Sequence, residues 1–133
     1  MSWDKEIDEL HHRGTLAEAM GGVDKVARQH EFGKLTIRER VDAIVDPGSF
    51  HEVGKLAGVG QYDTDGNLVS FTPSNYVFGT AEIDGRAVMI SGDDFTVRGG
   101  SADASIGAKR MQAEGLALEL GLPHIRLVDG MGG

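Results

Sequence analysis

The chain has 133 residues, 40% of them hydrophobic and 26% charged, a composition typical of a single folded globular domain. Its formal net charge of −8 disfavours a nucleic-acid partner, because binding to phosphate backbones requires a basic surface. The absence of cysteine excludes disulfides, thiolate catalysis and cysteine-ligated zinc. No apolar run approaches the roughly 20 residues of a membrane-spanning helix, and residues 1–20 lack the apolar core of a secretory signal. We therefore expect a cytoplasmic protein without a nucleic-acid or membrane partner.

The N-terminal segment, residues 2–30, is expected to form two helices separated by a glycine pair at 21–22. Ser2 can cap the first helix, and Asp4 and Glu6 suit its positive end. Because polar residues surround both helices, the segment should dock on another surface rather than nucleate a core. A role in oligomer contacts and a loosely packed surface helix both fit this pattern.

The composition then shifts, which divides the chain into a helical arm, residues 1–32, and a patterned body, residues 33–133. The body opens with a capping box, with Thr36 at the N-cap and Glu39 three residues on. Apolar residues follow at helical spacing until a Pro-Gly pair at 47–48 ends the helix.

Strand signals follow. A short strand is expected over residues 50–56, and residues 57–75, rich in Gly, Asp, Ser and Thr, are expected to form a long loop. Within it, residues 63–67 fit an Asp-Gly turn rather than a calcium-binding loop. The glycine stands at the fourth position of the loop instead of the sixth, and no glutamate stands at the twelfth. Two apolar runs joined by Asp-Gly at 84–85 predict a β-hairpin with a type I′ turn over residues 76–92.

The C-terminal part is expected to run from a strand end through a glycine pair and a long helix to a strand over residues 124–128. Ser101 or the glycines at 99–100 cap this helix, and Gly121 and Pro123 end it. One apolar stripe should pack closely against a sheet; it comprises Ala104, Ala108, Met111, Gly115 and Leu118. A strand–strand–helix–strand order with a right-handed crossover is typical of parallel-sheet α/β proteins.

Side-chain chemistry is weakly represented. The five histidines show no spacing that suits a metal ion, and no segment matches a hydrolase elbow, a P-loop or a dinucleotide fingerprint. Asp93 and Asp94 could form an acid/base pair, although a cap on the turn after a strand fits them better. Arg98, Lys109 and Arg110 could bind a small anion together, or could be separate solvated charges.

Main-chain chemistry has two candidate sites. Glycine-rich turns at 99–101 and 130–133 each follow a buried strand, and ligands of open α/β proteins bind at such strand ends. Glycine lets a ligand approach the peptide N–H groups, which can hold a phosphate or an oxyanion without any side chain. The alternative is that both are tight turns without a ligand.

Several segments, in order and at matching spacing, carry a family resemblance. They are 33–40 (GKLTIRER), 46–52 (DPGSFHE), 79–80 (GT), 83–88 (IDGRAV), 93–101 (DDFTVRGGS), 120–123 (LGLP) and 129–133 (DGMGG). Together they resemble the N-terminal part of the carboxyltransferase (beta) subunit of biotin-dependent acyl-CoA carboxylases, the propionyl-, acetyl- and methylcrotonyl-CoA carboxylase group. Each segment alone would be a weak signal.

The resemblance implies an α/β fold, a crotonase/ClpP-like superhelix of ββα units, here its N-terminal part preceded by the helical arm. It implies transfer of CO₂ from carboxybiotin to the α-carbon of an acyl-CoA, with the ureido nitrogen of biotin taking the α-proton. Peptide N–H groups then stabilise the thioester enolate, which agrees with the lack of an obvious side-chain base or nucleophile. Biotin would be carried on a partner, namely a biotin carboxyl carrier or biotin carboxylase subunit; homo-oligomers are implied, and no metal.

The resemblance also implies site residues. The oxyanion hole best matches Gly132 and Gly133, in either of two registers one residue apart, because residues 130–133 read Gly-Met-Gly-Gly where the family has Ser-Gly-Gly. The turn that holds Phe95, Gly99, Gly100 and Ser101 resembles the segment that lies along CoA.

Two alternatives stay open. Family members are several times longer, and a second domain completes the biotin half of the site, so we expect this chain alone to be unable to carboxylate. A non-catalytic CoA-binding or assembly fragment, such as a split or truncated paralogue, is one alternative. The related acyl-CoA decarboxylase carboxyltransferase subunit is the other.

Overall fold

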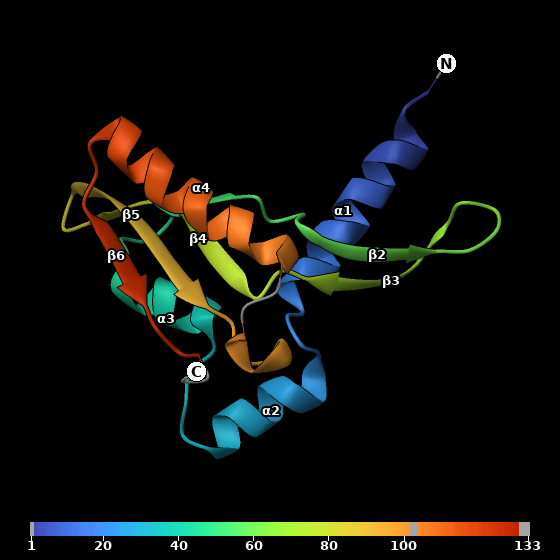
Figure 1. Ribbon diagram of the computed structural model, residues 1–133, viewed down its shortest axis with the longest axis horizontal. Coiled ribbons are helices and arrows are strands. Elements are labelled where there is room, and N and C mark those ends of the chain that lie inside the picture. The colour runs from blue at the N-terminus through green and yellow to red at the C-terminus, as the bar shows by residue number, and fades with distance from the viewer. Residues whose placement is uncertain (1, 102–103, 131–133) are drawn as a thin grey trace.

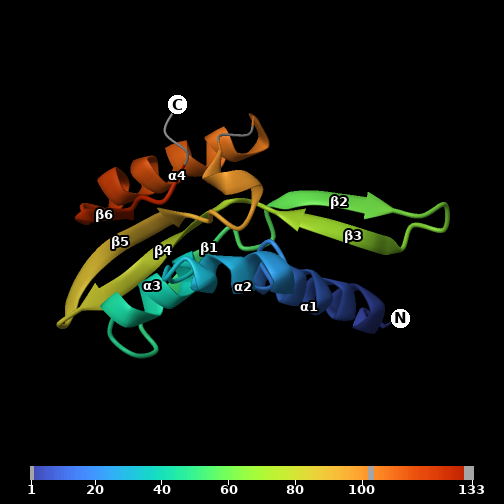
Figure 2. The same cartoon turned by 90° about the horizontal axis from the view of Figure 1, so that it is seen from below.

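A computed structural model of the chain describes residues 2–101 and 104–130, with side chains for all of these except 104–106. A four-stranded sheet has helix α4 on one face and helix α3 on the other; α2 and α1 lie on the same side as α3, and α1 extends beyond the sheet (Figures 1 and 2). No described helix is long and apolar enough to cross a membrane. The elements in chain order are α1 (Asp4–Glu18), α2 (Val23–Glu31), α3 (Ile37–Ile44), β1 (His51–Val53), β2 (Gly58–Tyr62), β3 (Leu68–Pro73), β4 (Tyr76–Ile83), β5 (Arg86–Asp93), the 3₁₀ turn η1 (Arg98–Gly100), α4 (Ala104–Leu120) and β6 (His124–Leu127).

The main sheet has the order β1-β4-β5-β6. Strand β4 pairs antiparallel with both β1 and β5, and the predicted β4–β5 hairpin is confirmed. Its two turn residues, Asp84 and Gly85, have φ of 50° and 76°, as a type I′ turn requires. Strand β6 lies parallel to β5, joined through α4, which confirms the predicted parallel unit.

Alternation along the central strands fills both faces of this sheet. Val88 and Ile90 of β5 pack against the buried face of α3, which contributes Ile37 and Val41. The residue between them, Met89, packs under α4 with other buried side chains. The second half of the hairpin is therefore covered on both sides, as its continuous apolar run predicts.

The predicted N-terminal caps of α1 and α3 differ in outcome. The capping box of α3 is confirmed: the Thr36 hydroxyl accepts from the Glu39 N–H at 3.3 Å, and the Glu39 carboxylate accepts from the Thr36 N–H at 2.7 Å. The prediction for Ser2 is wrong in register. Trp3 occupies the N-cap of α1 without a side-chain cap, and Ser2 instead accepts a bond from the Asp4 N–H at 3.2 Å.

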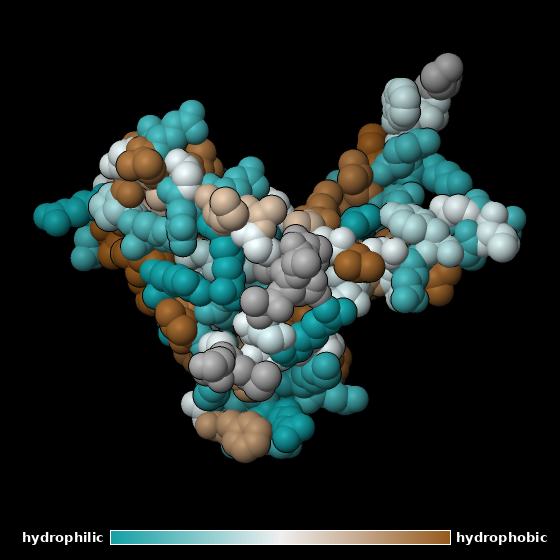
Figure 3. Space-filling model, in the orientation of Figure 1, coloured by the Kyte–Doolittle hydropathy of each residue, from teal (hydrophilic) through white to brown (hydrophobic). Residues whose placement is uncertain are grey.

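The expected loop over residues 57–75 is wrong, because it folds into a second hairpin, β2–β3. Its turn has the expected form: the Asp63 carboxylate accepts from the N–H groups of Asp65 and Asn67. Arg13 of α1 anchors the hairpin, donating to the Leu56 carbonyl and lying 4.5 Å above the Phe71 ring. Figure 3 shows α1 and this hairpin projecting together from the body, with apolar atoms along α1.

The predicted sheet-facing stripe of α4 is also wrong. Ala108, Met111, Gly115 and Leu118 are exposed, Met111 at 73% and Leu118 at 85%, and the side chain of Ala104 lies outside the described part. Lys109, Ala113 and Ala117 face the sheet instead. The helix carries apolar residues on both sides, so periodicity alone could not decide which side is buried.

Lys109 is the unusual member of the buried side. It is 7% exposed and lies so close to Gly54 that a Cβ there would be 3.2 Å from the Lys109 Cε. Burial lowers the pKa of Lys109 to about 8, and the nearby Glu52 charge raises it less than burial lowers it, while Arg38 adds to the lowering. Arg38 and Glu52 form their own ion pair at 2.7 Å.

Replacing Lys109 by Met should therefore stabilise the fold at pH 7. The pKa of Lys109 falls from 10.5 to about 8 on folding, so between pH 8 and pH 10.5 the unfolded chain binds more protons than the folded chain. The stability of the wild type therefore rises as the pH rises through this range. The gain in Lys109→Met should be at most about 3 kcal/mol below pH 8 and should vanish above the ordinary lysine pKa. Urea unfolding at several pH values measures it, with the exposed Lys5→Met as control; a destabilised or pH-independent Lys109→Met would contradict the analysis.

Candidate functional site

The glycine turn at 99–101 touches the exit of β6, where the second predicted glycine turn begins. Gly100, buried and at φ 68°, lies against the exit of β6, where a Cβ would be 2.8 Å from the Asp129 carbonyl oxygen and 3.1 Å from the Gly130 Cα. This separation is too short for any side chain, so glycine is required for the contact as well as for the backbone angle. Gly132 and Gly133, the residues matched to the oxyanion hole, lie outside the described part of the chain.

The structure separates the two aspartates at the end of β5. Asp94 caps the turn that follows, accepting from the Thr96 N–H at 2.9 Å and the Thr96 hydroxyl at 2.6 Å. Burial raises the pKa of Asp94 although these bonds oppose the rise. Asp93 is buried and pairs with Arg110 at 2.6 Å and with Arg126 at 3.5 Å. Asp94 therefore has the predicted capping role, and both carboxylates are engaged.

Helix α2 covers this turn at close range. The Gly21 N–H donates to the Thr96 hydroxyl at 2.9 Å, and a Cβ on Gly21 would lie 2.0 Å from the Thr96 carbonyl oxygen. Part of the N-terminal arm thus packs directly on the segment that resembles the CoA turn.

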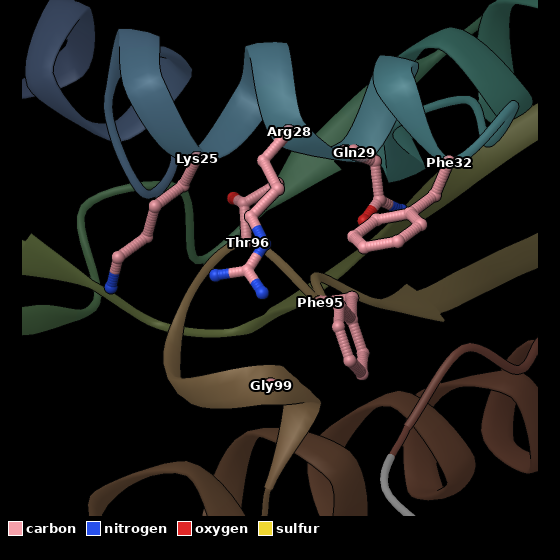
Figure 4. Close-up of a pocket in the computed structure, with 7 residues that line it drawn as sticks. All are labelled: Lys25, Arg28, Gln29, Phe32, Phe95, Thr96 and Gly99. Carbon is pink, nitrogen blue, oxygen red and sulfur yellow. The ribbon is translucent and has the colours of Figure 1, made fainter.

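A pocket of about 450 Å³ lies between α2 and this turn (Figure 4). In Figure 4 the α2 side chains extend towards the turn, with Arg28 directed into the gap and the ring of Phe32 beside it. The Arg28 guanidinium carbon is 5.7 Å from the Phe32 ring centroid. The lining residues are Lys25, Arg28, Gln29, Phe32, Phe95, Thr96 and Gly99.

Sequence reasoning missed the cations of this pocket. Lys25 and Arg28 are exposed and belong to α2, whereas the predicted cationic group was Arg98, Lys109 and Arg110. The structure separates Lys109 from Arg110: the Lys109 side chain lies near Gly54, and Arg110 forms an ion pair with Asp93. A readable signal existed: the pocket residues of α2 recur at 25, 28, 29 and 32, the spacing of one helix face.

Asp129, at the exit of β6, is held by one residue of the arm and one residue at the start of the body. Its carboxylate accepts from the Lys34 ammonium at 2.8 Å and from the Gln29 amide at 3.0 Å. Burial raises the pKa of Asp129, but these two bonds and the charges of Lys34 and Arg40 outweigh it, so the pKa lies below its ordinary value.

Two of the four residues matched to the CoA segment, Phe95 and Gly99, line the pocket; Gly100 supports the β6 exit, and Ser101 closes the turn by donating its N–H to the Arg98 carbonyl. Among the described residues, no group of three or more His, Asp or Glu side chains could hold a metal ion. The cations, aromatic rings and peptide groups that line this pocket can together bind an anion that carries a planar ring.

Known proteins resemble this chain in sequence and in fold. Transcarboxylase 12S, whose crystal structure is described as a hexamer with methylmalonyl-CoA bound, superposes with a TM-score of 0.84 at 32% identity over all of this chain and 26% of its own. The carboxyltransferase subunit of Haloferax mediterranei propionyl-CoA carboxylase is 34% identical over 99% of this chain and 26% of its own. The methylmalonyl-CoA decarboxylase subunit alpha of Veillonella parvula is 32% identical over 96% of this chain and 25% of its own.

The architecture is that of the crotonase-like carboxyltransferase domains, as the resemblance predicts. Residues 28–133 match the carboxyl transferase domain model, and the chain belongs to this family. It spans about a quarter of the length of the curated relatives it matches.

The contact between α2 and the turn gives a test. Gly21→Ala should force the Thr96 backbone away and destabilise the fold by about 1–3 kcal/mol, since a Cβ cannot fit at 2.0 Å. Gly14→Ala, in α1 with its nearest neighbour 4.0 Å away, should be neutral or stabilising by up to about 1 kcal/mol. Chemical unfolding of both variants decides, and equal effects would contradict the packing described.

Proposed function

We propose that this chain is the acyl-CoA-binding N-terminal part of the carboxyltransferase component of a biotin-dependent acyl-CoA carboxylase. The observation that carries the proposal is the pocket with two cations and two phenylalanine rings, open beside the joined glycine turns. CoA combines phosphates, an adenine ring and a thioester, so it needs these three kinds of surface in one place.

The nucleotide end of CoA fits the pocket. Lys25 and Arg28 would neutralise phosphate charge, and the rings of Phe32 and Phe95 would contact the adenine or the pantetheine chain. The thioester would then extend past Gly99 towards the corner where Gly100 meets the β6 exit.

The chemistry would take place at that corner. Loss of the α-proton gives an enolate whose oxygen is negative, and the peptide N–H groups of Gly132 and Gly133 would donate to it. The enolate carbon forms a bond to the carboxyl carbon of carboxybiotin, the second substrate, while the bond from that carbon to the ureido nitrogen breaks. The proton removed from the α-carbon ends on that nitrogen, so no carboxylate base of this chain is needed, and Asp93 and Asp94 keep their structural roles.

Partners follow from the same reaction. Carboxybiotin would arrive on a biotin carboxyl carrier served by a biotin carboxylase subunit, and the carboxyltransferase would act as a homo-oligomer. We assign no residue of this chain to biotin, because cations and phenyl rings suit an anionic nucleotide better than a neutral ureido ring. The division into an arm, 1–32, and a body, 33–133, belongs to this proposal, with α2 as the part of the arm that serves the pocket.

The decarboxylase subunit is a second candidate, favoured by the relative from Veillonella parvula. It would use the same pocket and the same stabilised enolate in the reverse direction. Its identity of 32% does not exceed the 34% of the carboxylase relative, so the carboxylase stays the primary proposal.

Calorimetric titration with CoA tests the pocket. Arg28→Met should weaken CoA binding about tenfold, which corresponds to loss of one charge-assisted contact of about 1.4 kcal/mol. Arg86→Met, at the tip of the β4–β5 hairpin and away from the pocket, should bind as wild type. The assignment would be refuted if the wild-type chain did not bind CoA, or if the two variants bound CoA with equal affinity.

The isolated chain should form no carboxylated acyl-CoA when supplied with acyl-CoA and carboxybiotin, because relatives of this family are about four times as long. A radiolabelled-carboxyl transfer assay measures this directly. Turnover above background by the 133-residue chain would contradict the proposal that this chain supplies only the acyl-CoA part of the active site.

A further inference from the structure

We infer that Lys34 and Gln29, by holding the Asp129 carboxylate, position the glycine corner, where Gly100 meets the exit of β6, and that a ligand bound in the α2 pocket changes the conformation of this corner through the same contacts. These contacts to Asp129 are called the clamp. The second half of this inference rests on the proposed function; the first half does not. Both residues are positioning residues, since they contact Asp129 rather than reacting atoms.

The clamp grips both oxygens of one carboxylate. Lys34 donates to Asp129 Oδ1 at 2.8 Å, and Gln29 donates to Oδ2 at 3.0 Å. The Asp129 side chain is 18% exposed, so it has lost much of its water and depends on these donors. Gln29 is itself buried at 5% exposure and also donates to the Leu35 carbonyl at 3.3 Å, which fixes its amide.

The gripped residue is part of the corner. The Asp129 carbonyl is the group that Gly100 approaches, and Gly130 follows directly. One residue earlier, the Val128 carbonyl accepts from Arg40 at 3.5 Å. The exit of β6 is therefore held on one side by groups from 29–40 and on the other by the η1 turn.

The same clamp borders the pocket. Gln29 lines it, and the Lys34 ammonium lies 4.8 Å from the centroid of Phe95, another lining residue. A molecule that displaces the Gln29 amide breaks its bond to Asp129, and one that moves the Phe95 ring changes the surroundings of the Lys34 ammonium that holds the other oxygen. Lys25 lines the same pocket and has no described bond to Asp129, which makes it the matched control.

The first experiment needs no ligand. In the ¹⁵N-labelled chain, Lys34→Met should shift the Asp129 and Gly130 amide resonances and raise their hydrogen-exchange rates at least fivefold. Lys34→Arg, which keeps a cation within reach of the carboxylate, should restore both readouts, and Lys25→Met should leave them as in wild type. Thermal unfolding of each variant separates this local effect from loss of the fold.

The second experiment adds 3′-phospho-ADP, the nucleotide part of CoA. Saturation should shift the Asp129 and Gly130 amides in wild type and in Lys34→Arg. In Lys34→Met the affinity should stay within about twofold, but the shift at Gly130 should fall by at least half. Lys25→Met should show the reverse pattern: weaker affinity, with an undiminished shift at saturation.

The outcomes separate the two ideas. If the amides of 129–130 do not respond to Lys34→Met in the free chain, or if Lys34→Arg fails to restore them while the fold is intact, the clamp is refuted. If they respond but 3′-phospho-ADP and CoA do not bind, the clamp stands and the proposed function fails. If the nucleotide binds and Gly130 does not move, coupling between pocket and corner is refuted.

Discussion

Contact between two backbones without an intervening side chain is the constraint on which the site depends. Gly100 approaches the Asp129 carbonyl so closely that a single added carbon would collide with it. This contact joins the carboxyl ends of β5 and β6, adjacent parallel strands, where α/β folds place their ligands. It places the first glycine turn directly against Asp129 and Gly130, so that the two strand exits form one corner, the place where the proposed function puts the enolate oxygen.

The second half of the helical arm lies beside that corner, whereas α1 packs along the β2–β3 hairpin. Gly21 lets α2 lie on the Thr96 backbone, and Gln29 and Lys34 reach the carboxylate at the end of β6. The polar character of the arm predicted that it would dock on another surface. That surface belongs to the same chain. The cations of α2 then face a pocket whose other wall is the β5–α4 turn.

Much of the fold follows from local sequence, and much of the site does not. The type I′ hairpin at 84–85 and the capping box at Thr36 are local backbone chemistry, so their residues predict them. The β2–β3 hairpin was missed because its glycines have low strand propensity, although Gly58 faces the Thr72 carbonyl too closely for a side chain. The pocket needs α2 and the 95–99 turn side by side, a long-range placement that no local pattern encodes.

Helix α4 has apolar residues on both sides and still has a defined rotation. Burial of Met111 and Leu118 would release more apolar surface from water than burial of Ala113 and Ala117, yet the alanines face the sheet. Small side chains allow the helix axis to lie near the strands, and in this rotation Arg110 pairs with Asp93. The ion pair therefore helps to fix the rotation of α4 about its own axis, against the larger apolar area that the opposite rotation would bury.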